Sequence, residues 1–409
     1  MPDDYQPRLA DAELEVLLQQ LPALLLTGPR ACGKTTTASR YAKTIIRLDE
    51  AVEAAGVAAD PDVALRGLPE PVLLDEWQAV PSVLGAVKRA VDTDFRAGRF
   101  IVTGSVRAEY DAAVWPGTGR LVRVPVGVLA EREIRGLKGP LLIDRLAQGD
   151  LPDRRTDEDL RDLIGLALKG GFPEPALGMA ERGRVTWFRS YMEQLLSRDT
   201  RQLGQRRSPQ GLRRFLEAYA LHSAAVVTDQ TLHEAAGVDR KTGIAYEELL
   251  LDLRVAERLP AWTSSRVKRL VRQPKRILVD SALMGAALRL DVEGVLRDGR
   301  LLGRLLETFV LAQLRAEEPF AVSQPRLFHL RQREGRHEVD VVVELGGGRV
   351  IGLEVRATAA PAAADARHLA WLRDELGDRF VLGAVLHTGP RPFPLGERLV
   401  ALPIPALWS

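Results

Sequence analysis

The stretch from Gly28 to Thr36 reads GPRACGKTT and contains residue types that bind phosphate. Gly28 and Gly33 let the backbone adopt turns that point successive N–H groups at phosphate oxygens. Lys34 would place a compact positive charge on the β and γ phosphates, and the Thr35 hydroxyl would ligate Mg²⁺. The spacing therefore predicts a loop that binds a nucleoside triphosphate. Its residues are Gly28, Pro29, Arg30, Ala31, Cys32, Gly33, Lys34, Thr35 and Thr36.

The residues on either side of this loop support that prediction. The loop follows an apolar run, Ala23 to Thr27, which has the length and composition of a buried parallel strand. It leads into residues 35–43, which can continue as a helix whose positive end faces the anion. A glycine-rich turn that contains Lys-Thr by chance is the alternative, but it does not account for both flanking elements.

A second apolar run ends in two acids, Asp75 and Glu76. A buried strand over 71–74 would deliver both carboxylates to the sheet edge that carries the phosphate loop. Asp75 is then expected to hold Mg²⁺ through water, and Glu76 to orient and polarise the attacking water. Alone, such a run is as consistent with a strand end capped by acids. The phosphate loop upstream favours the catalytic interpretation.

Two further residues are candidates for contacts with the terminal phosphate. Ser105 follows the apolar run Phe100 to Val102, where it would contact the γ-phosphate or the attacking water, or else end the strand in a turn. Arg120 closes the sequence GTGR at 117–120, before another apolar run. It is a candidate for offsetting transition-state charge on a γ-phosphate, for example in a neighbouring subunit. A surface arginine is the alternative for Arg120.

The elements that must position these residues alternate between strand and helix patterns. This alternation predicts an α/β fold in which a parallel sheet has flanking helices. A chain of 409 residues is too long for one ordinary core, so two or three domains are expected. We predict a nucleotide-binding domain over 1–135, a helical and winged-helix domain over 136–300, and a C-terminal α/β domain over 301–409.

Taken together, GPRACGKTT, LLDEWQ, FIVTGS and GTGR resemble the AAA-type ATP-binding module that accompanies the DUF4143 domain in bacteria and archaea. The resemblance implies an AAA+-like core, ATP as the nucleotide and Glu76 as the hydrolytic carboxylate. It also implies that Ser105 takes the first sensor position and that Arg120 belongs to the Gly-Arg pair closing the module. The turn at 169–174 and the ending at 401–408 match the same family, so the resemblance covers nearly the whole chain.

Composition excludes several classes of protein. The 57 basic and 55 acidic residues nearly cancel, and a hydrophobic content of 46% supports globular folding throughout. The single cysteine, Cys32, excludes an intramolecular disulfide and fits a reducing cytosol. The sequence lacks a basic, apolar leader and an apolar run that could span a bilayer. We therefore expect a cytoplasmic protein without a membrane partner.

The middle region carries the pattern of a helix-turn-helix followed by a wing. A short helix over 229–236, a glycine turn and a second helix beginning near Arg240 predict the two helices. Residues 255–262 predict the first strand of the wing, and the segment 254–276 holds eight basic residues against one acid. Such a stripe is typical of a winged helix that binds nucleic acid. Winged helices also bind proteins, so a structural or partner-binding role stays open.

Three acids in the C-terminal region, Glu307, Asp340 and Glu354, are candidates for a second metal site. Glu307 lies in a predicted helix over 302–317, and the other two lie on adjacent strands of a predicted hairpin. Three such carboxylates are typical ligands of a divalent metal for phosphodiester hydrolysis. Carboxylates that are simply solvated are the alternative.

This pattern resembles the PD-(D/E)XK nuclease fold, to which the C-terminal DUF4143 region is similar. The nuclease pattern ends in Glu-x-Lys, whereas this sequence reads Glu354-Val355-Arg356. A lysine near a metal-bound water can exchange protons, but an arginine keeps its charge and only donates. Arg356 is therefore suited to position phosphate or water and unsuited to act as a base. A nuclease-like fold used for binding is favoured over active nuclease chemistry.

The sequence thus supports two functions. The first is a Mg²⁺-dependent ATPase coupled to a DNA- or RNA-handling module, because a phosphate loop, a basic winged helix and nuclease-like acids share one chain. The second is a nucleotide-switched interaction protein, in which ATP sets domain arrangement or oligomeric state and the C-terminal domain docks a protein partner. A homo-oligomer is expected in either case.

Overall fold

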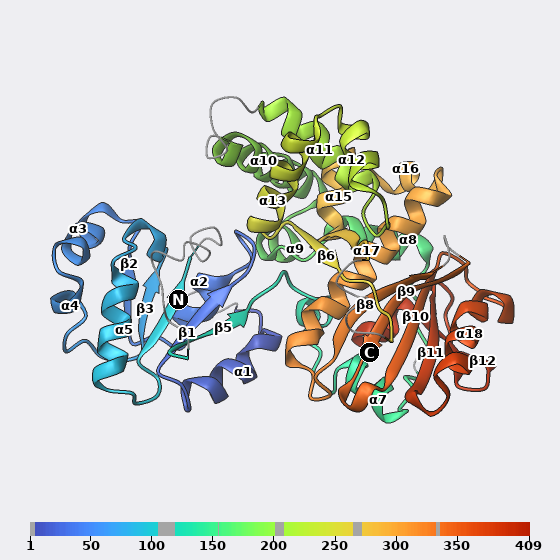
Figure 1. Cartoon of the computed structure of the whole chain (residues 1–409), viewed down its shortest axis with the longest axis horizontal. Coiled ribbons are helices and arrows are strands. Elements are labelled where there is room, and N and C mark those ends of the chain that lie inside the picture. The colour runs from blue at the N-terminus through green and yellow to red at the C-terminus, as the bar shows by residue number, and fades with distance from the viewer. Residues whose placement is uncertain (1–4, 105–118, 154, 201–207, 265–271, 333–335) are drawn as a thin grey trace. The chain divides into compact units, whose positions relative to one another are not determined.

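The chain divides into two compact units. The first comprises residues 1–128 with 252–254, and the second comprises residues 129–251 with 255–409. The computed structural model, traced in Figure 1, describes residues 5–104, 119–153, 155–200, 208–264, 272–332 and 336–409.

A five-stranded parallel sheet forms the centre of the first unit. The strands, in the spatial order β2-β3-β4-β1-β5, are β1 (Ala23–Thr27), β2 (Thr44–Arg47), β3 (Val72–Asp75), β4 (Phe100–Thr103) and β5 (Leu121–Pro125). The three inner strands, β1, β3 and β4, are buried along their whole length, as expected for strands covered on both faces. Because the strands are parallel, Thr27, Asp75 and Thr103 all end at the same edge of the sheet.

Helices flank this sheet, which confirms the predicted α/β fold. They are α1 (Leu9–Leu18), α2 (Lys34–Ser39), α3 (Ala51–Ala59), α4 (Pro61–Ala64) and α5 (Val83–Thr93). Helix α5 buries Val83, Val87 and Val91, which recur every four residues and therefore line one face. That face packs into a core that includes Trp77 and Leu74.

A helical region opens the second unit. Among the described residues it contains the following helices and strands: α6 (Glu131–Ile134), α7 (Leu142–Gln148), α8 (Leu160–Lys169), α9 (Pro173–Gly178), α10 (Glu181–Thr200), α11 (Pro209–Leu221), α12 (Asp229–Ala236), α13 (Arg240–Asp252), β6 (Ala256–Leu259), β7 (Lys275–Leu278), α15 (Ser281–Leu288), α16 (Val292–Leu296) and α17 (Gly299–Glu317). The two helices and the strand expected between residues 229 and 262 are present, and β6 pairs antiparallel with β7.

An aromatic cluster anchors α10. Phe172 is fully buried and meets Phe188 edge to face, with 5.8 Å between ring centroids. Trp187 stacks on Tyr191 at 5.1 Å, and the Trp187 ring N–H donates to Glu174 at 2.8 Å. Aromatic contacts of this kind fix the position of a helix because large rings fill space in few orientations. Helix α10 is therefore held firmly at its amino-terminal half.

The C-terminal part of the second unit is a mixed six-stranded sheet. In the spatial order β12-β13-β11-β10-β9-β8, its strands are β8 (Arg326–Gln332), β9 (His337–Glu344), β10 (Val350–Arg356), β11 (Phe380–His387), β12 (Phe393–Gly396) and β13 (Leu399–Pro403). Helix α18 (Arg367–Leu376) packs Leu369 and Leu372 into the same core as Phe380 of the sheet. The predicted hairpin, whose two strands carry Asp340 and Glu354, is confirmed as the antiparallel pair β9 and β10.

Short 3₁₀ helices complete the fold. They are η1 (Trp77–Ala79), η4 (Glu318–Phe320), η6 (Gly346–Gly348), η7 (Ala363–Ala366), η8 (Gly377–Arg379) and η9 (Ile404–Trp408). Within the described ranges, none of the helices combines the length and apolar character that a bilayer crossing requires. The predicted domain boundaries after residues 135 and 300 stay predictions. Helix α17 begins at Gly299, next to the second boundary.

Candidate functional site

The loop after β1 has the backbone shape that the glycine spacing predicts. Ala31 and Gly33 both adopt the left-handed conformation, with φ of 59° and 94°. Gly28 has to be glycine, because a Cβ there would lie 1.9 Å from the Val126 carbonyl oxygen. Left-handed residues in such a loop turn consecutive N–H groups toward one side. The loop therefore emerges from the carboxyl end of β1 already folded as a concave backbone turn.

Lys34 begins α2 and is 8% exposed. Its ammonium group donates to the carbonyl oxygens of Gly28 at 3.1 Å and Pro29 at 2.7 Å. These bonds hold the charge over the loop that it follows in sequence. Among the other loop residues, Cys32 is buried and Ala31 and Thr36 are exposed.

Asp75 meets the loop from the end of β3. Its Oδ1 atom accepts a hydrogen bond from the Thr35 hydroxyl at 2.9 Å, and a second from the Thr103 hydroxyl. Asp75 is 7% exposed, so both bonds form in a largely dry environment. The structure brings together two residues that the sequence names as Mg²⁺ ligands, and that role stays a prediction. The sequence did not indicate Thr103, which ends β4 and lies beside Asp75 only because β3 and β4 are neighbours.

Glu76 follows directly and has a left-handed backbone, with φ of 53° and ψ of 47°. This conformation costs a residue with a side chain about 1–3 kcal/mol and persists only where neighbours enforce it. Trp77, which is 1% exposed, supplies that anchor in the core. The Glu76 carboxylate accepts a hydrogen bond from the side-chain amide of Gln78. The two predicted acids therefore point to different partners, Asp75 to hydroxyl groups and Glu76 to an amide.

Arg8 is a second residue that the sequence did not indicate. Its guanidinium group donates to the carbonyl oxygen of Cys32 at 2.9 Å and to that of Gly127 at 2.7 Å. The Cys32 thiol donates to the Val126 carbonyl at 3.0 Å, on the same stretch of backbone. Arg8 therefore ties the phosphate loop to the segment that follows β5. No local sequence pattern predicts this role for an arginine that lies just before a helix.

Arg120 is not at the phosphate loop of its own chain. It precedes β5, whose first residue, Leu121, lies opposite Ala23, the first residue of β1. The phosphate loop leaves the opposite end of β1, which is about 16 Å from the level of Arg120 at a rise of 3.3 Å per residue. Arg120 instead pairs with Asp92 at 2.5 Å. A contact with a phosphate in the same chain is thereby contradicted by strand direction, and a contact in a neighbouring subunit stays a prediction. Ser105 lies outside the described residues.

Comparison with known families bears directly on this site. An AAA domain model matches residues 20–134, which include the phosphate loop, Asp75 and Glu76. Two domains of unknown function follow, DUF8612 over 160–294 and DUF4143 over 302–407. The chain is an AAA-type ATP-binding protein with a DUF4143 domain. The predicted family is therefore confirmed.

Relatives of this AAA-type protein have no described activity in their names. Uncharacterised proteins of Mycobacterium bovis and Mycobacterium tuberculosis are each 28% identical to it over 400 residues, covering 97% of this chain and 83% of theirs. Among solved structures, a Walker-type ATPase of Pyrococcus abyssi is similar at 16% identity with a TM-score of 0.44. That match covers 71% of this chain and 97% of the other.

The three predicted metal ligands of the DUF4143 region meet in one cluster, but cations lie among them. Glu307 pairs with the Lys275 ammonium group, and Asp340 Oδ1 lies 3.7 Å from the same group. On the other side, Arg356 pairs with Glu354, and its Nη1 lies 3.4 Å from Asp340 Oδ2. Asp340 also accepts from the Val355 backbone N–H at 2.9 Å. Lys275, on β7, is the member that the sequence did not indicate.

Charge balance explains the electrostatics of this cluster. Three carboxylates face two cations, so one negative charge is in excess in a buried place. Burial raises the pKa of Glu307 to about 8, and the nearby Asp340 carboxylate adds to the effect. Burial also raises the pKa of Glu354 well above its usual range, again with help from Asp340. One of these acids therefore retains its proton near neutral pH.

The cluster is an ion-pair network and not a set of free ligands. Among the described residues, no three His, Cys, Asp or Glu side chains are placed to hold a metal ion. One oxygen of Glu307 pairs with Lys275, and one oxygen of Glu354 pairs with Arg356. In this structure Lys275 and Arg356 lie among the acids that were predicted to hold a divalent ion, and the second metal site stays a prediction.

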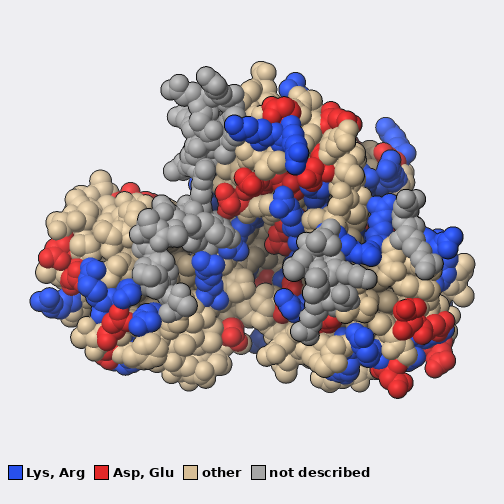
Figure 2. Space-filling model, in the orientation of Figure 1, with Lys and Arg blue, Asp and Glu red and all other residues tan. Residues whose placement is uncertain are grey.

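The basic segment 254–276 is largely engaged within the protein. Arg276 donates to Glu247 at 2.7 Å, and Arg258 pairs with the same carboxylate at 2.8 Å. Arg272 donates to the Arg331 carbonyl oxygen at 3.1 Å. Lysines, arginines and acids alternate over the face in Figure 2. The described part of this segment is therefore a structural network, while residues 265–271 lie outside the described residues.

Proposed function

We propose that this AAA-type protein is a Mg²⁺-dependent ATPase in which Glu76 orients the attacking water. The hydrogen bond between Thr35 and Asp75 carries the proposal, because it joins the two residues that a nucleotide-bound Mg²⁺ requires on opposite sides of the site. Lys34 would exchange its bonds to the loop carbonyls for phosphate oxygens.

The residues at this edge fit ATP and Mg²⁺. The left-handed turns at Ala31 and Gly33 create the kind of backbone concavity that binds anions. Thr35 and Asp75 are hard oxygen donors of the kind that Mg²⁺ prefers. Bound Mg²⁺ supplies charge neutralisation on the phosphate oxygens. Asp75 is held for that role by Thr103.

The surroundings of Glu76 support its proposed role as the catalytic carboxylate. It is only partly buried and accepts a hydrogen bond from the side-chain amide of Gln78. An ionised carboxylate has two oxygens with several acceptor positions, so it can hold a water molecule at the same time. The Gln78 amide would orient the carboxylate, and the carboxylate would orient and polarise the water.

The Glu76→Gln variant tests this proposal. We expect it to bind ATP within about twofold of wild type, because the amide keeps size and shape. Turnover should fall by about 10²–10⁴, the usual contribution of a positioned acid or base. The matched control is Glu50→Gln, an exposed acid before α3. Normal turnover in Glu76→Gln would remove this residue from the assigned role without affecting the nucleotide-binding part of the proposal.

We further propose that ATP switches an interaction of this protein, and that the DUF4143 domain binds without cleaving. Support comes from Lys275 and Arg356, which neutralise the acid cluster where a nuclease would keep its metal. A cytoplasmic homo-oligomer, with Arg120 near a neighbouring nucleotide, is one form of the switch. Light scattering on Glu76→Gln with and without ATP tests this; unchanged mass and unchanged shape would contradict it.

Coupling to nucleic acid is a second candidate function, favoured by one observation. Arg240 and Lys241 are exposed at the start of α13, which would be the recognition helix if α12, α13 and the β6–β7 pair act as a winged helix. DNA or RNA at low salt should then raise ATP turnover, and a double substitution of these residues by alanine should abolish the effect. Stimulation that survives the double substitution would count against this surface.

A further inference from the structure

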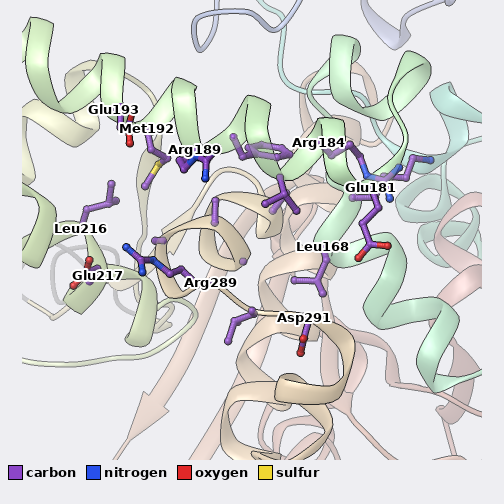
Figure 3. A pocket seen from close by; sticks show the side chains of 18 of the residues that line it. Leu168, Glu181, Arg184, Arg189, Met192, Glu193, Leu216, Glu217, Arg289 and Asp291 are labelled. Atoms are coloured by element: carbon purple, nitrogen blue, oxygen red, sulfur yellow. The ribbon is translucent and has the colours of Figure 1, made fainter.

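The helical region contains a cavity of about 650 Å³ that none of the functions above uses. Its walls come from α8, α10, α11 and the α15–α16 segment, as Figure 3 shows. Every lining residue falls between 165 and 292, inside the range of the DUF8612 match. The cavity is therefore a property of that domain. It shares no lining residue with the nucleotide site or with the acid cluster.

The cavity exists because a wall of large side chains faces a wall of small ones. Helix α10 contributes Val185, Phe188, Met192 and Leu196, which recur at three or four residues and so lie on one face. The α15 segment opposite contributes glycine and alanine. These small lining residues are Ala282, Gly285, Ala286 and Ala287. The space between the helices thus follows from the sequence of α15.

Size and shape limit what can fill this space. Ligand pockets typically measure about 300–1,000 Å³, and this cavity lies within that range. Its lining follows α10 from Glu181 to Leu196, about 22 Å at 1.5 Å per residue. An elongated, mainly apolar ligand satisfies both the volume and the length.

The charged residues at the rim select the end group of that ligand. Arg189, Arg213 and Arg289 line the cavity and are exposed, and none makes an ion pair with another described residue. Arg184 and Lys169 add to the basic side, against the acids Glu181, Glu193 and Glu217. A fourth acid, Asp291, already caps α16 through the Gly294 backbone N–H at 2.7 Å. The balance is basic, and arginine binds carboxylate or phosphate through two parallel hydrogen bonds.

We propose that this cavity binds an amphiphilic anion, a linear apolar chain that ends in a carboxylate or a phosphate. The chain lies along α10 between Phe188 and the small residues of α15. The head group meets Arg189 of α10 and Arg289 of the opposite wall, both of which Figure 3 labels at the cavity. Carboxylate and phosphate heads share the same recognition chemistry, and titration with each distinguishes them.

Calorimetric titration of the full chain with four twelve-carbon compounds, below their micelle concentrations, tests the proposal. The compounds are dodecanoate, dodecyl phosphate, dodecanol and dodecyltrimethylammonium. We expect at least one of the two anions to bind tenfold or more tightly than the neutral and cationic compounds. Equal binding of all four, or no binding of either anion, would overturn the proposal.

Variants locate the binding. Arg189→Ala should weaken anion binding about tenfold, whereas Arg182→Ala, an exposed arginine on the same helix outside the lining, should leave it unchanged. Ala286→Leu fills the cavity with a good helix former and should weaken binding of every chain by more than tenfold. Equal effects of Arg189→Ala and Arg182→Ala on anion binding would overturn the assignment of the head-group site to Arg189. The comparison of these two arginine variants decides the question even if Ala286→Leu lowers the melting temperature of the protein.

Discussion

The Thr35 hydroxyl donates a hydrogen bond to Asp75 at 2.9 Å, across 40 residues of sequence. The bond joins the first turn of α2 to the end of β3, so the two halves of the nucleotide site are in register before any ligand binds. Preorganised groups lower the cost of binding because they need no rearrangement. The Thr103 hydroxyl donates to the same oxygen atom, which fixes the carboxylate from a second strand.

Thr35→Val should separate nucleotide binding from Mg²⁺ binding. Valine keeps the shape of threonine and removes the hydroxyl, so the loop and Lys34 stay in place. We expect ATP affinity in the presence of Mg²⁺ to fall about tenfold or more, because both the metal contact and the bond to Asp75 disappear. Affinity in EDTA should change little. Thr35→Ser is the control and should bind like wild type; a loss of the same size in EDTA would contradict the metal role.

Thr103→Val tests whether the orientation of Asp75 matters for turnover. The substitution leaves Asp75 and Thr35 in contact but removes the second donor, so the carboxylate can rotate. We expect turnover to fall about tenfold while the ATP dissociation constant changes less than threefold. The control is Thr103→Ser, which keeps the donor. Turnover equal to wild type in Thr103→Val would show that the Thr35 bond alone positions Asp75.

Arg8→Met tests the link behind the phosphate loop. Methionine keeps most of the apolar stem and removes both donors, which leaves the Cys32 and Gly127 carbonyl oxygens to find water. The loop should then become more mobile, and ATP affinity should fall about tenfold by fluorescence titration. Arg40→Met, an exposed arginine at the end of α2, is the matched control. Unchanged affinity in Arg8→Met would limit this residue to a role in stability.

The residues that sequence predicted and those that it missed differ in how far apart in sequence their partners lie. Lys34 was identified because strand, loop and helix are continuous, so its environment is local. Thr103 contacts Asp75 because of the order of the strands in the sheet, and Arg8 contacts Gly127 because of the path of the chain after β5. No local sequence pattern encodes either feature. Lys275 comes from a strand of a different sheet than Asp340. Arg120 lies at the amino end of β5, so its contact with a phosphate in a neighbouring subunit and its alternative as a surface arginine both stay open.

Lys275→Met should destabilise the second unit strongly. It removes one of two cations from a cluster of three buried carboxylates, and breaking a buried ion pair typically costs about 3–5 kcal/mol. The remaining acids can lessen that cost by taking up protons, so the loss should be larger at pH 8 than at pH 5.5. Chemical denaturation followed at both pH values measures it. A loss smaller than 1 kcal/mol at pH 8 would show that the network is solvated and weak.

Glu307→Gln should reduce the pH dependence of stability. Burial raises the folded-state pKa of Glu307 to about 8, above its ordinary value of 4.5, so the folded protein holds a proton that the unfolded chain releases. That contribution is fully present below pH 4.5 and is lost as the pH rises to 8. The wild type should therefore lose stability across this window, and the variant, which cannot ionise there, should lose less. Asp280, buried with a pKa of about 6, contributes equally to both proteins and cancels in the comparison. Identical slopes of melting temperature against pH would place the retained proton elsewhere in the cluster, with Glu354 as the next residue to substitute.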